Sequence, residues 1–423
     1  MASKNNFTLR DFAIGINGGE EAGGTELQIK QEHLLWLRYT EDIQSASIKM
    51  EAMITDSQTA VCSHLKGMEP CFISFSANSD DENDTISHFM MIYDVQDRTQ
   101  EDGKSKAVLL MCTPDMINNA AMKISKRYGP GSGKKIHEIV KSDLLETEIG
   151  TDKDIFFDQT ENKFSFISCF WSPFTMISWL CSKSIPAEKG SGANATAGFC
   201  FYENKDGYNF RAFDSFHHQE VVTYLKVGHT PSENEDQKDK NIIPISSAQV
   251  LSQTDILKGL NIGSYASKVM TLDLNDMKYE EIPFNINKYY EDIPLLNPDS
   301  PKPAYYEKFK EGVRATRIMS KVMDTALFTS GKYTEGFTRQ LSQSALREKL
   351  FYNKSVEVEF IHQDLALKVG DVVHLTTYKG KEKEEDKENS GKYIIGRLER
   401  EFLNAKDSMS TKLLLYTDSP GTS

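Results

Sequence analysis

The feature that most constrains the fold is a series of short segments in which apolar and polar residues alternate. Between residues 46 and 54, apolar side chains occupy every second position, and further apolar runs follow at residues 71–75, 89–93 and 107–111. A period of two residues is that of a β-strand with one buried face. Because polar segments separate these runs, we predict an antiparallel barrel or sandwich over residues 29–113.

The N-terminal segment has a different composition. It is polar and rich in glycine, with Gly18, Gly19, Gly23 and Gly24 close together. Such a composition is typical of an arm or a mobile terminus. We therefore expect residues 1–28 to form an N-terminal arm.

The period changes to that of a helix after residue 113. Thr113 and Pro114 are a favourable helix start, because threonine caps the first turn and proline loses no hydrogen bond there. Apolar residues then recur at helical spacing in segments that begin near residues 114, 136 and 173. The pattern predicts a mostly helical domain over residues 114–195.

A hairpin signal follows at residues 199–213. Two aromatic runs flank the turn at 204–207, whose Asp-Gly pair tolerates the positive φ angles of a tight turn. An isolated hairpin is only marginally stable, and this one has apolar side chains on both faces, around Phe199, Phe201 and Phe213. It therefore needs strands from elsewhere in the chain.

The C-terminal part has the pattern of an antiparallel meander. Its strand-like runs lie at residues 356–360, 372–376, 393–395 and 412–416, with a charged hairpin tip at 379–391. The preceding residues 219–349 contain a proline-rich stretch, and helices are expected near 307–328 and 334–351. Since this part offers no long alternating run, we predict that residues 198–216 pair with the meander.

Charge and cysteine content limit the classes of function. The net charge of −13 disfavours binding to the DNA backbone, whose phosphates proteins neutralise with Lys and Arg. It fits a surface past which DNA slides, or one that only keeps the protein soluble. The six cysteines, at 62, 71, 112, 169, 181 and 200, form no Cys-x-x-Cys pair and predict reduced, buried thiols. Neither a long apolar window nor a secretory signal occurs, so we expect no membrane insertion.

Two motifs could be mistaken for ligand sites. Residues 129–135 (GPGSGKK) lack the glycine and the Ser or Thr of a phosphate-binding loop, because Tyr128 and Lys135 occupy those positions. His217 and His218 are adjacent, so in an extended segment they point to opposite faces. No third ligand has metal-site spacing. We expect a turn between helices and hydrogen-bonded or exposed imidazoles at a strand end, with no cofactor and no metal.

Acidic and aromatic clusters also have simple explanations. The acidic runs at 80–82 and 384–386 lie between strands, where facing, desolvated carboxyl groups for glycoside cleavage are not expected. A domain core or a subunit interface explains an aromatic cluster better than a ligand platform does. Its members are Phe164, Phe166, Phe170, Trp171, Phe174 and Trp179. We identify no catalytic residue and expect a non-enzymatic protein.

Two groups of short motifs carry a family resemblance. The first comprises WSPF at 171–174, ISWL at 177–180, CFYE at 200–203, DGYNF at 206–210 and Asp214-Ser215. The second comprises LKVGDVV at 367–373, GKYIIG at 391–396 and KLLLYTD at 412–418. In this order and spacing they resemble the central baseplate hub proteins of contractile-tailed (myovirus) bacteriophages. Residues 29–112 fit the first barrel of those proteins more loosely, and 219–349 match least.

The resemblance implies an α+β fold with two small antiparallel β-barrels similar to tail-tube domains. The first barrel would cover residues 29–113, followed by the helical domain over 114–195. A second, split barrel would combine 196–218 with 350–423, and 219–349 would be an inserted domain of mixed structure.

The resemblance also implies a structural role and a set of partners. In that family, a homotrimeric ring adapts the hexameric tail tube to the trimeric cell-puncturing spike and forms part of the DNA channel. The implied partners are the tail tube protein and the tail spike or needle protein, with tape-measure and baseplate wedge proteins as further candidates. DNA would pass without specific binding. The implied location is the virion tail baseplate, after assembly in the host cytoplasm.

Two alternatives stay open. One is a hub or spike with peptidoglycan hydrolase activity, which the absence of any Glu followed nine residues later by Asp disfavours. The other is a spike module of a related contractile injection or secretion machine.

Overall fold

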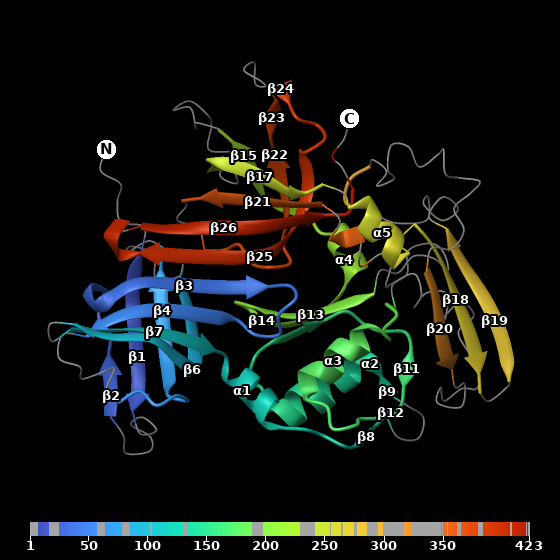
Figure 1. Cartoon of the computed structure of the whole chain (residues 1–423), viewed down its shortest axis with the longest axis horizontal. Helices are drawn as coiled ribbons and strands as arrows, with labels where there is room; N and C mark the ends of the chain where they lie inside the picture. The colour runs from blue at the N-terminus through green and yellow to red at the C-terminus, as the bar shows by residue number, and fades with distance from the viewer. Residues whose placement is uncertain are drawn as a thin grey trace.

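Strands dominate the computed structural model, and helices are few, which agrees with the α+β class (Figure 1). The structure describes residues 7–16, 25–56, 64–77, 85–101, 104–129, 134–187, 198–228, 242–253, 255–263, 265–274, 277–285, 295–298, 317–323, 348, 350–352, 354–361, 365–379, 384–406, 408–419 and 421.

The first sheet is antiparallel throughout and has the order β3-β4-β7-β6-β5-β1-β2. Its strands are β1 (Thr8–Ile16), β2 (Thr25–Gln28), β3 (Leu34–Asp42), β4 (Lys49–Asp56), β5 (Pro70–Ser76), β6 (Thr85–Glu101) and β7 (Lys104–Cys112). The alternating residues near 50, 73, 90 and 109 point into one core, as their period predicts.

The expectation of an N-terminal arm over residues 1–28 is wrong for the part of it that the structure describes. β1 pairs with β5 from Thr8 to Ile14, and β2 pairs with β1. Phe12 and Ile14 are fully buried. The ring of Phe7 also stacks on Phe402 near the C-terminus, with 3.8 Å between ring centroids. Burial of these apolar side chains outweighs the glycine-rich composition that suggested an arm.

The second sheet is assembled from more distant parts of the chain. Its strands are β15 (Val221–Val227), β16 (Ile242–Ile245), β17 (Ser247–Ser252), β21 (Lys354–Phe360), β22 (Val372–Thr376), β25 (Gly391–Leu403) and β26 (Ser408–Thr417). The pairings run β15-β22-β25-β26-β21-β17. β17 follows β16 after a bend at Ser246, and β16 pairs with β15, so the pairings return to their start.

The predicted pairing of residues 198–216 with the C-terminal meander is therefore wrong. β13 (Phe199–Asn204) and β14 (Gly207–Ala212) form the expected hairpin, but β14 continues into a parallel pairing with β10 (Ile155–Phe157). The partners of the meander come instead from residues 221–252, which were assigned to an inserted domain. A long run of polar and charged residues at 228–240 interrupts that stretch in the sequence, which hides its two short apolar runs from a search for alternation.

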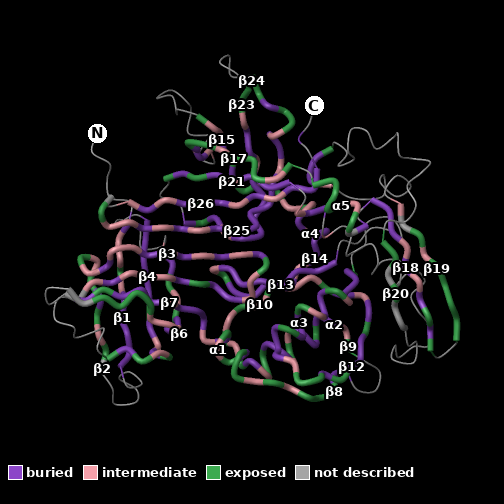
Figure 2. The backbone as a smooth tube through the Cα atoms, in the orientation of Figure 1, coloured by how far each residue is buried: buried purple, intermediate pink, exposed green. Residues whose placement is uncertain are grey.

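The hairpin does have two apolar faces, as predicted, and each is covered. Phe199 and Phe201 enter a core shared with the helical layer, whereas Cys200 and Tyr202 enter the core of the two large sheets. The helical layer contains α1 (Pro114–Ala121), α2 (Ile136–Glu138), the π-helix η3 (Ile139–Ile149), α3 (Pro173–Cys181) and the short strands β8 (Arg127–Tyr128), β9 (Lys134–Lys135), β11 (Lys163–Phe164) and β12 (Phe166–Ile167). The hairpin is thus the middle of three layers (Figures 1 and 2).

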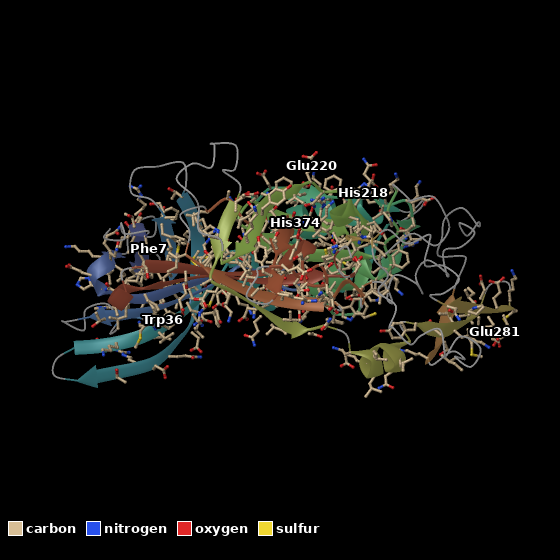
Figure 3. The ribbon with its side chains drawn as sticks, turned by 90° about the horizontal axis from the view of Figure 1, so that it is seen from above. Phe7, Trp36, His218, Glu220, Glu281 and His374 are labelled. Atoms are coloured by element: carbon tan, nitrogen blue, oxygen red, sulfur yellow. The ribbon has the colours of Figure 1, made fainter. Side chains whose placement is uncertain are left out.

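The short helix α4 (Phe213–His217) connects the hairpin to β15, and α5 (Ile256–Ile262) precedes a small separate sheet. It consists of β18 (Ala266–Asp273), β19 (Lys278–Asn285) and β20 (Arg317–Met323), with β18 in the centre. β20 contradicts the helix expected near 307–328. Of the helix expected near 334–351, the structure describes only a helical end at 348, 350 and 351. Figure 3 places Phe7 and Trp36 at one end of the molecule and Glu281 of the small sheet at the other.

Candidate functional site

The two large sheets meet in a direct strand pairing. β3 lies antiparallel to β25, in register from Trp36 opposite Leu403 to Asp42 opposite Arg397. Because the backbone hydrogen bonds are continuous across this junction, both sheets form one surface. Along each strand the side chains alternate between an inner, buried face and an outer, solvent-facing one.

The inner face of the junction is held by a buried carboxylate. Glu41 is fully buried, and its Oε1 accepts hydrogen bonds from the Tyr39 hydroxyl at 2.6 Å and from the Lys205 N–H at 3.0 Å. Its Oε2 accepts one from the Val369 N–H at 2.8 Å. Burial raises the pKa of Glu41, and these bonds and the charge of Arg400 oppose the shift. One side chain thus connects β3, the hairpin turn and the turn before β22.

A second buried carboxylate ties the three layers together. Glu203 on β13 accepts hydrogen bonds from the Ile48 N–H and the Thr113 hydroxyl, each at 3.0 Å. Its other oxygen is 2.6 Å from Lys153 Nζ, which is also 3.1 Å from Asp115 on α1. Burial raises the pKa of Glu203, and the charge of Lys153 opposes the shift. Thr113 precedes α1, as predicted, but its hydroxyl donates to Glu203 and does not cap the helix.

The outer face carries ion pairs between neighbouring strands. Arg38 lies directly opposite Glu401 on β25 and Glu51 on β4, with nitrogen–oxygen distances of 2.9 and 3.1 Å. Its Nε is also 3.3 Å from Glu399. Partial burial alone would lower the pKa of Arg38, but the hydrogen bond with Glu401 and the three carboxylate charges raise it.

Further pairs extend this pattern along both sheets. Arg397 pairs with Asp42 at 3.2 Å, and Lys412 on β26 pairs with Glu357 on β21 at 2.9 Å. We call the outward residues of β4, β3, β25, β26 and β21 the joined face. In these ion pairs, three cationic side chains of the joined face contact five carboxylates. The joined face was not identified from the sequence, although the Glu-Arg-Glu alternation at 399–401 could have indicated it.

Of the two motifs set aside in the sequence, the structure describes the histidine pair fully and the glycine-rich segment in part. In the 129–135 segment, residues 130–133 lie outside the described part, and Lys134 Nζ is 2.7 Å from Asp143. His217 and His218 end α4 rather than a strand. The buried His217 ring bonds Asp418 at 2.8 Å, and His218 is exposed. Among the described residues, no group of three or more His, Cys, Asp or Glu side chains could hold a metal ion.

The structure describes one of the two acidic runs and all six residues of the aromatic cluster. Residues 80–82 lie outside the described part, and Glu384 and Glu385 are exposed on the short strand β24 (Glu384–Glu385), which pairs with β23 (Tyr378–Lys379). Five of the six clustered aromatics belong to the core of the helical layer or pack against it, whereas Phe170 is 73% exposed.

The cysteines that the structure describes carry free thiols. Cys71, Cys112, Cys181 and Cys200 are free and buried, and Cys169 is free and exposed. Cys62 lies outside the described residues.

Over the described part of the chain, no helix has the length and apolar character needed to cross a membrane.

Comparison with known proteins shows a shared fold. No protein-family model and no curated protein matches the sequence. The 43 kDa tail protein of prophage MuSo2 from Shewanella oneidensis is similar over 96% of this chain and 98% of its own, with a TM-score of 0.51 and 9% identity. The tail protein from Neisseria meningitidis MC58 is similar over 96% of both chains, with a TM-score of 0.54 and 10% identity. The chain therefore has the fold of phage tail proteins along nearly its whole length.

Proposed function

We propose that this chain is a structural baseplate hub of a contractile phage tail. It would form a homotrimeric ring between the hexameric tail tube and the trimeric spike. The observation that carries the proposal is the joined face, where two sheets of one chain form a single surface through the β3–β25 pairing. Two large sheets per chain would let three chains present six units to a hexameric tube.

The chemistry of the joined face suits the wall of a DNA channel. Proteins hold the DNA backbone with free Lys and Arg side chains that displace counterions from phosphates. On the joined face, Arg38, Arg397 and Lys412 are already bound to carboxylates. The surplus of carboxylates repels phosphate, so DNA would pass without specific binding.

Exposed apolar side chains lie away from the junction on both sheets. On the first sheet, Phe72 and Phe89 stand directly opposite each other on β5 and β6 and are 38% and 54% exposed. On the second sheet, Tyr224 and Leu251 are 42% and 49% exposed. A contact between two different surfaces of identical chains closes into a ring when the rotation fits. We propose that these surfaces meet between neighbouring subunits.

The other proposed partners follow from the resemblance to baseplate hub proteins. The tail tube protein, the spike or needle protein, and tape-measure or wedge proteins would contact the ring in the virion tail baseplate, after assembly in the host cytoplasm. The role is mechanical, and we propose no catalytic activity. Incubation with purified peptidoglycan should release no reducing sugars. Release that a single carboxylate substitution abolishes would favour the hydrolase alternative instead.

The mass of the particle in solution tests the ring. Light scattering should give about 143 kDa, three times the 47.8 kDa of one chain. Phe89→Asp should shift the mass toward the monomer, because it places a charge in the proposed contact. Leu257→Asp, at a 75% exposed position on α5, is the matched control and should leave the mass unchanged. A wild-type monomer at micromolar concentration would contradict the trimer.

The joined face is tested by reversing its charge. The double variant Glu399→Lys and Glu401→Lys should retain duplex DNA in a mobility-shift assay at low salt, and added salt should abolish the binding. The same change at Glu280 and Glu281, on the exposed small sheet, is the control and should bind less. Equal DNA binding by both variants would contradict the proposal that the joined face lines the channel.

A further inference from the structure

The loop between β12 and α3 exposes an aromatic side chain on strained backbone. Phe170 is 73% exposed, and its φ angle is +55°. Bulky side chains rarely adopt positive φ, because Cβ crowds the backbone there. Glycine, Asn or Asp usually occupies such a position. Stability of the isolated chain therefore does not explain a phenylalanine at position 170, whereas strain of this kind accumulates at functional sites.

The loop holds Phe170 in a defined place. The Ser168 N–H donates to the Lys126 carbonyl at 3.0 Å, and the Ser168 hydroxyl donates to the Ile124 carbonyl at 2.9 Å. The Ile124 N–H in turn donates to the Trp171 carbonyl at 3.0 Å, and Trp171 packs on Trp179 with 5.3 Å between ring centroids. Both sides of Phe170 are thus anchored to the helical layer. A loop backbone that is already held in place loses little conformational entropy on binding.

The neighbours of Phe170 combine apolar and basic character. Ile167 is 65% exposed and lies directly opposite Arg127 in the β8–β12 pairing. Lys123 and Arg127 are exposed, and neither has an ion-pair partner among the described residues. Lys126 is also exposed but pairs with Glu148 at 2.6 Å. We call Lys123, Arg127, Ile167 and Phe170 the Phe170 tip. A local excess of positive charge is unusual in a chain of net charge −13.

We propose that the Phe170 tip docks onto a different protein of the same particle, in an apolar hollow bordered by carboxylates. Phe170 and Ile167 would fill the hollow, and Lys123 and Arg127 would pair with its rim. An aromatic anchor beside arginine is the composition that dominates binding energy at protein interfaces. The proposal rests on the proposed function only in that it needs a particle containing this chain.

Charge and size favour a protein partner over a membrane. Two apolar side chains bury too little area to hold a 47.8 kDa protein on a bilayer. An anionic lipid surface would also repel the net charge of the whole chain, whereas a carboxylate rim within a pocket acts only on the tip. The same repulsion acts against nucleic acid.

The native thiol next to Phe170 provides the first readout. Cys169 is exposed in the isolated chain, so iodoacetamide should modify it readily. In purified tail particles, modification of Cys169 measured by mass spectrometry should be at least tenfold slower. Carbodiimide treatment of the particles should link Lys123 to an Asp or Glu of another protein. Equal modification rates, or a link only to a second copy of this chain, would overturn the proposal.

A glycine substitution separates docking from folding. Phe170→Gly removes the ring and relieves the positive φ, so the isolated chain should melt at the same or a higher temperature. Its incorporation into particles should fall at least tenfold. Met277→Gly is the matched control, since Met277 is also apolar, 74% exposed and at a φ of +51°. Met277→Gly should incorporate normally, and normal incorporation of Phe170→Gly would overturn the proposal.

Three outcomes distinguish the sources of failure. Binding of the isolated chain to phosphatidylglycerol vesicles or to single-stranded DNA, lost in Phe170→Gly, would replace the protein partner with a lipid or a nucleic acid. If the chain is absent from tail particles, the proposed function fails together with the docking proposal. If the chain is present and Cys169 is modified freely there, only the docking proposal fails.

Discussion

The two faces of the β3–β25 junction carry the same kinds of side chain in opposite surroundings. On the inner face, Glu41 and Arg400 are buried and bonded mostly to backbone groups. On the outer face, Arg38 and its three carboxylates pair in contact with water. A buried charge without its partners is costly, whereas an exposed pair contributes little. The inner charges therefore determine how the layers fit, and the outer charges set only the electrostatic character of the surface.

The largest expected effect comes from the inner side of this comparison. Glu41→Ala leaves the Val369 and Lys205 N–H groups and the Tyr39 hydroxyl without their acceptor. We expect the free energy of unfolding to fall by about 3–5 kcal/mol, as measured by urea denaturation. Glu401→Ala on the joined face is the matched control. Equal losses in the two variants would remove the distinction between the faces.

A pH dependence should come from Asp371, in the turn bound to Glu41 through Val369. Burial raises the pKa of Asp371 to about 6, against hydrogen bonding by the Lys368 N–H and the charge of Lys368. A raised carboxyl pKa means that the folded chain binds this proton more tightly than the unfolded chain. Its contribution to stability is therefore complete below about pH 4 and is lost as the pH rises through about 6.

The variant Asp371→Asn isolates this contribution. It should be more stable than the wild type at pH 7.5 by about 1–3 kcal/mol, and the difference should vanish near pH 4. Thermal denaturation of both proteins across this range measures the difference directly. A wild type that is the more stable of the two at pH 7.5 would show that the Asp371 carboxylate is satisfied in the folded state.

The smallest expected effect on stability comes from the outer face of the junction. Arg38→Gln should lower the free energy of unfolding by no more than about 1 kcal/mol, because its ion pairs face water. The small loss should shrink further in 1 M salt, which screens exposed charges. Denaturation at both salt concentrations is the measurement. A loss of several kcal/mol would place Arg38 with the buried charges of the inner face.

The success of the sequence-based predictions follows the range of the interactions involved. In the first sheet, β4 to β7 were predicted because they lie close in sequence, whereas β1 and β2 were assigned to an arm. The second sheet was predicted only in its C-terminal half. Its pairing of β15 with β22 joins residues about 150 positions apart in parallel, and nothing in a single sequence specifies such a contact.

The candidate site was even less accessible from the sequence. The alternation at 399–401 indicates that the two glutamates share a face, but not that Arg38 lies opposite them. Glu41 and Glu203 resemble ordinary surface carboxylates in the sequence, and only the assembled layers show that they are buried.

The sequence by itself determined the local conformations of this protein. The strand period near residue 50, the Asp-Gly turn before β14 and the glycine at position 370, whose φ is +93°, each follow from neighbouring residues. The tertiary structure alone decided which strands pair and which charges are buried. The physical reason is that backbone hydrogen bonds are the same for every strand. The hairpin β13–β14 therefore lies where both of its apolar faces are covered, between the helical layer and the large sheets.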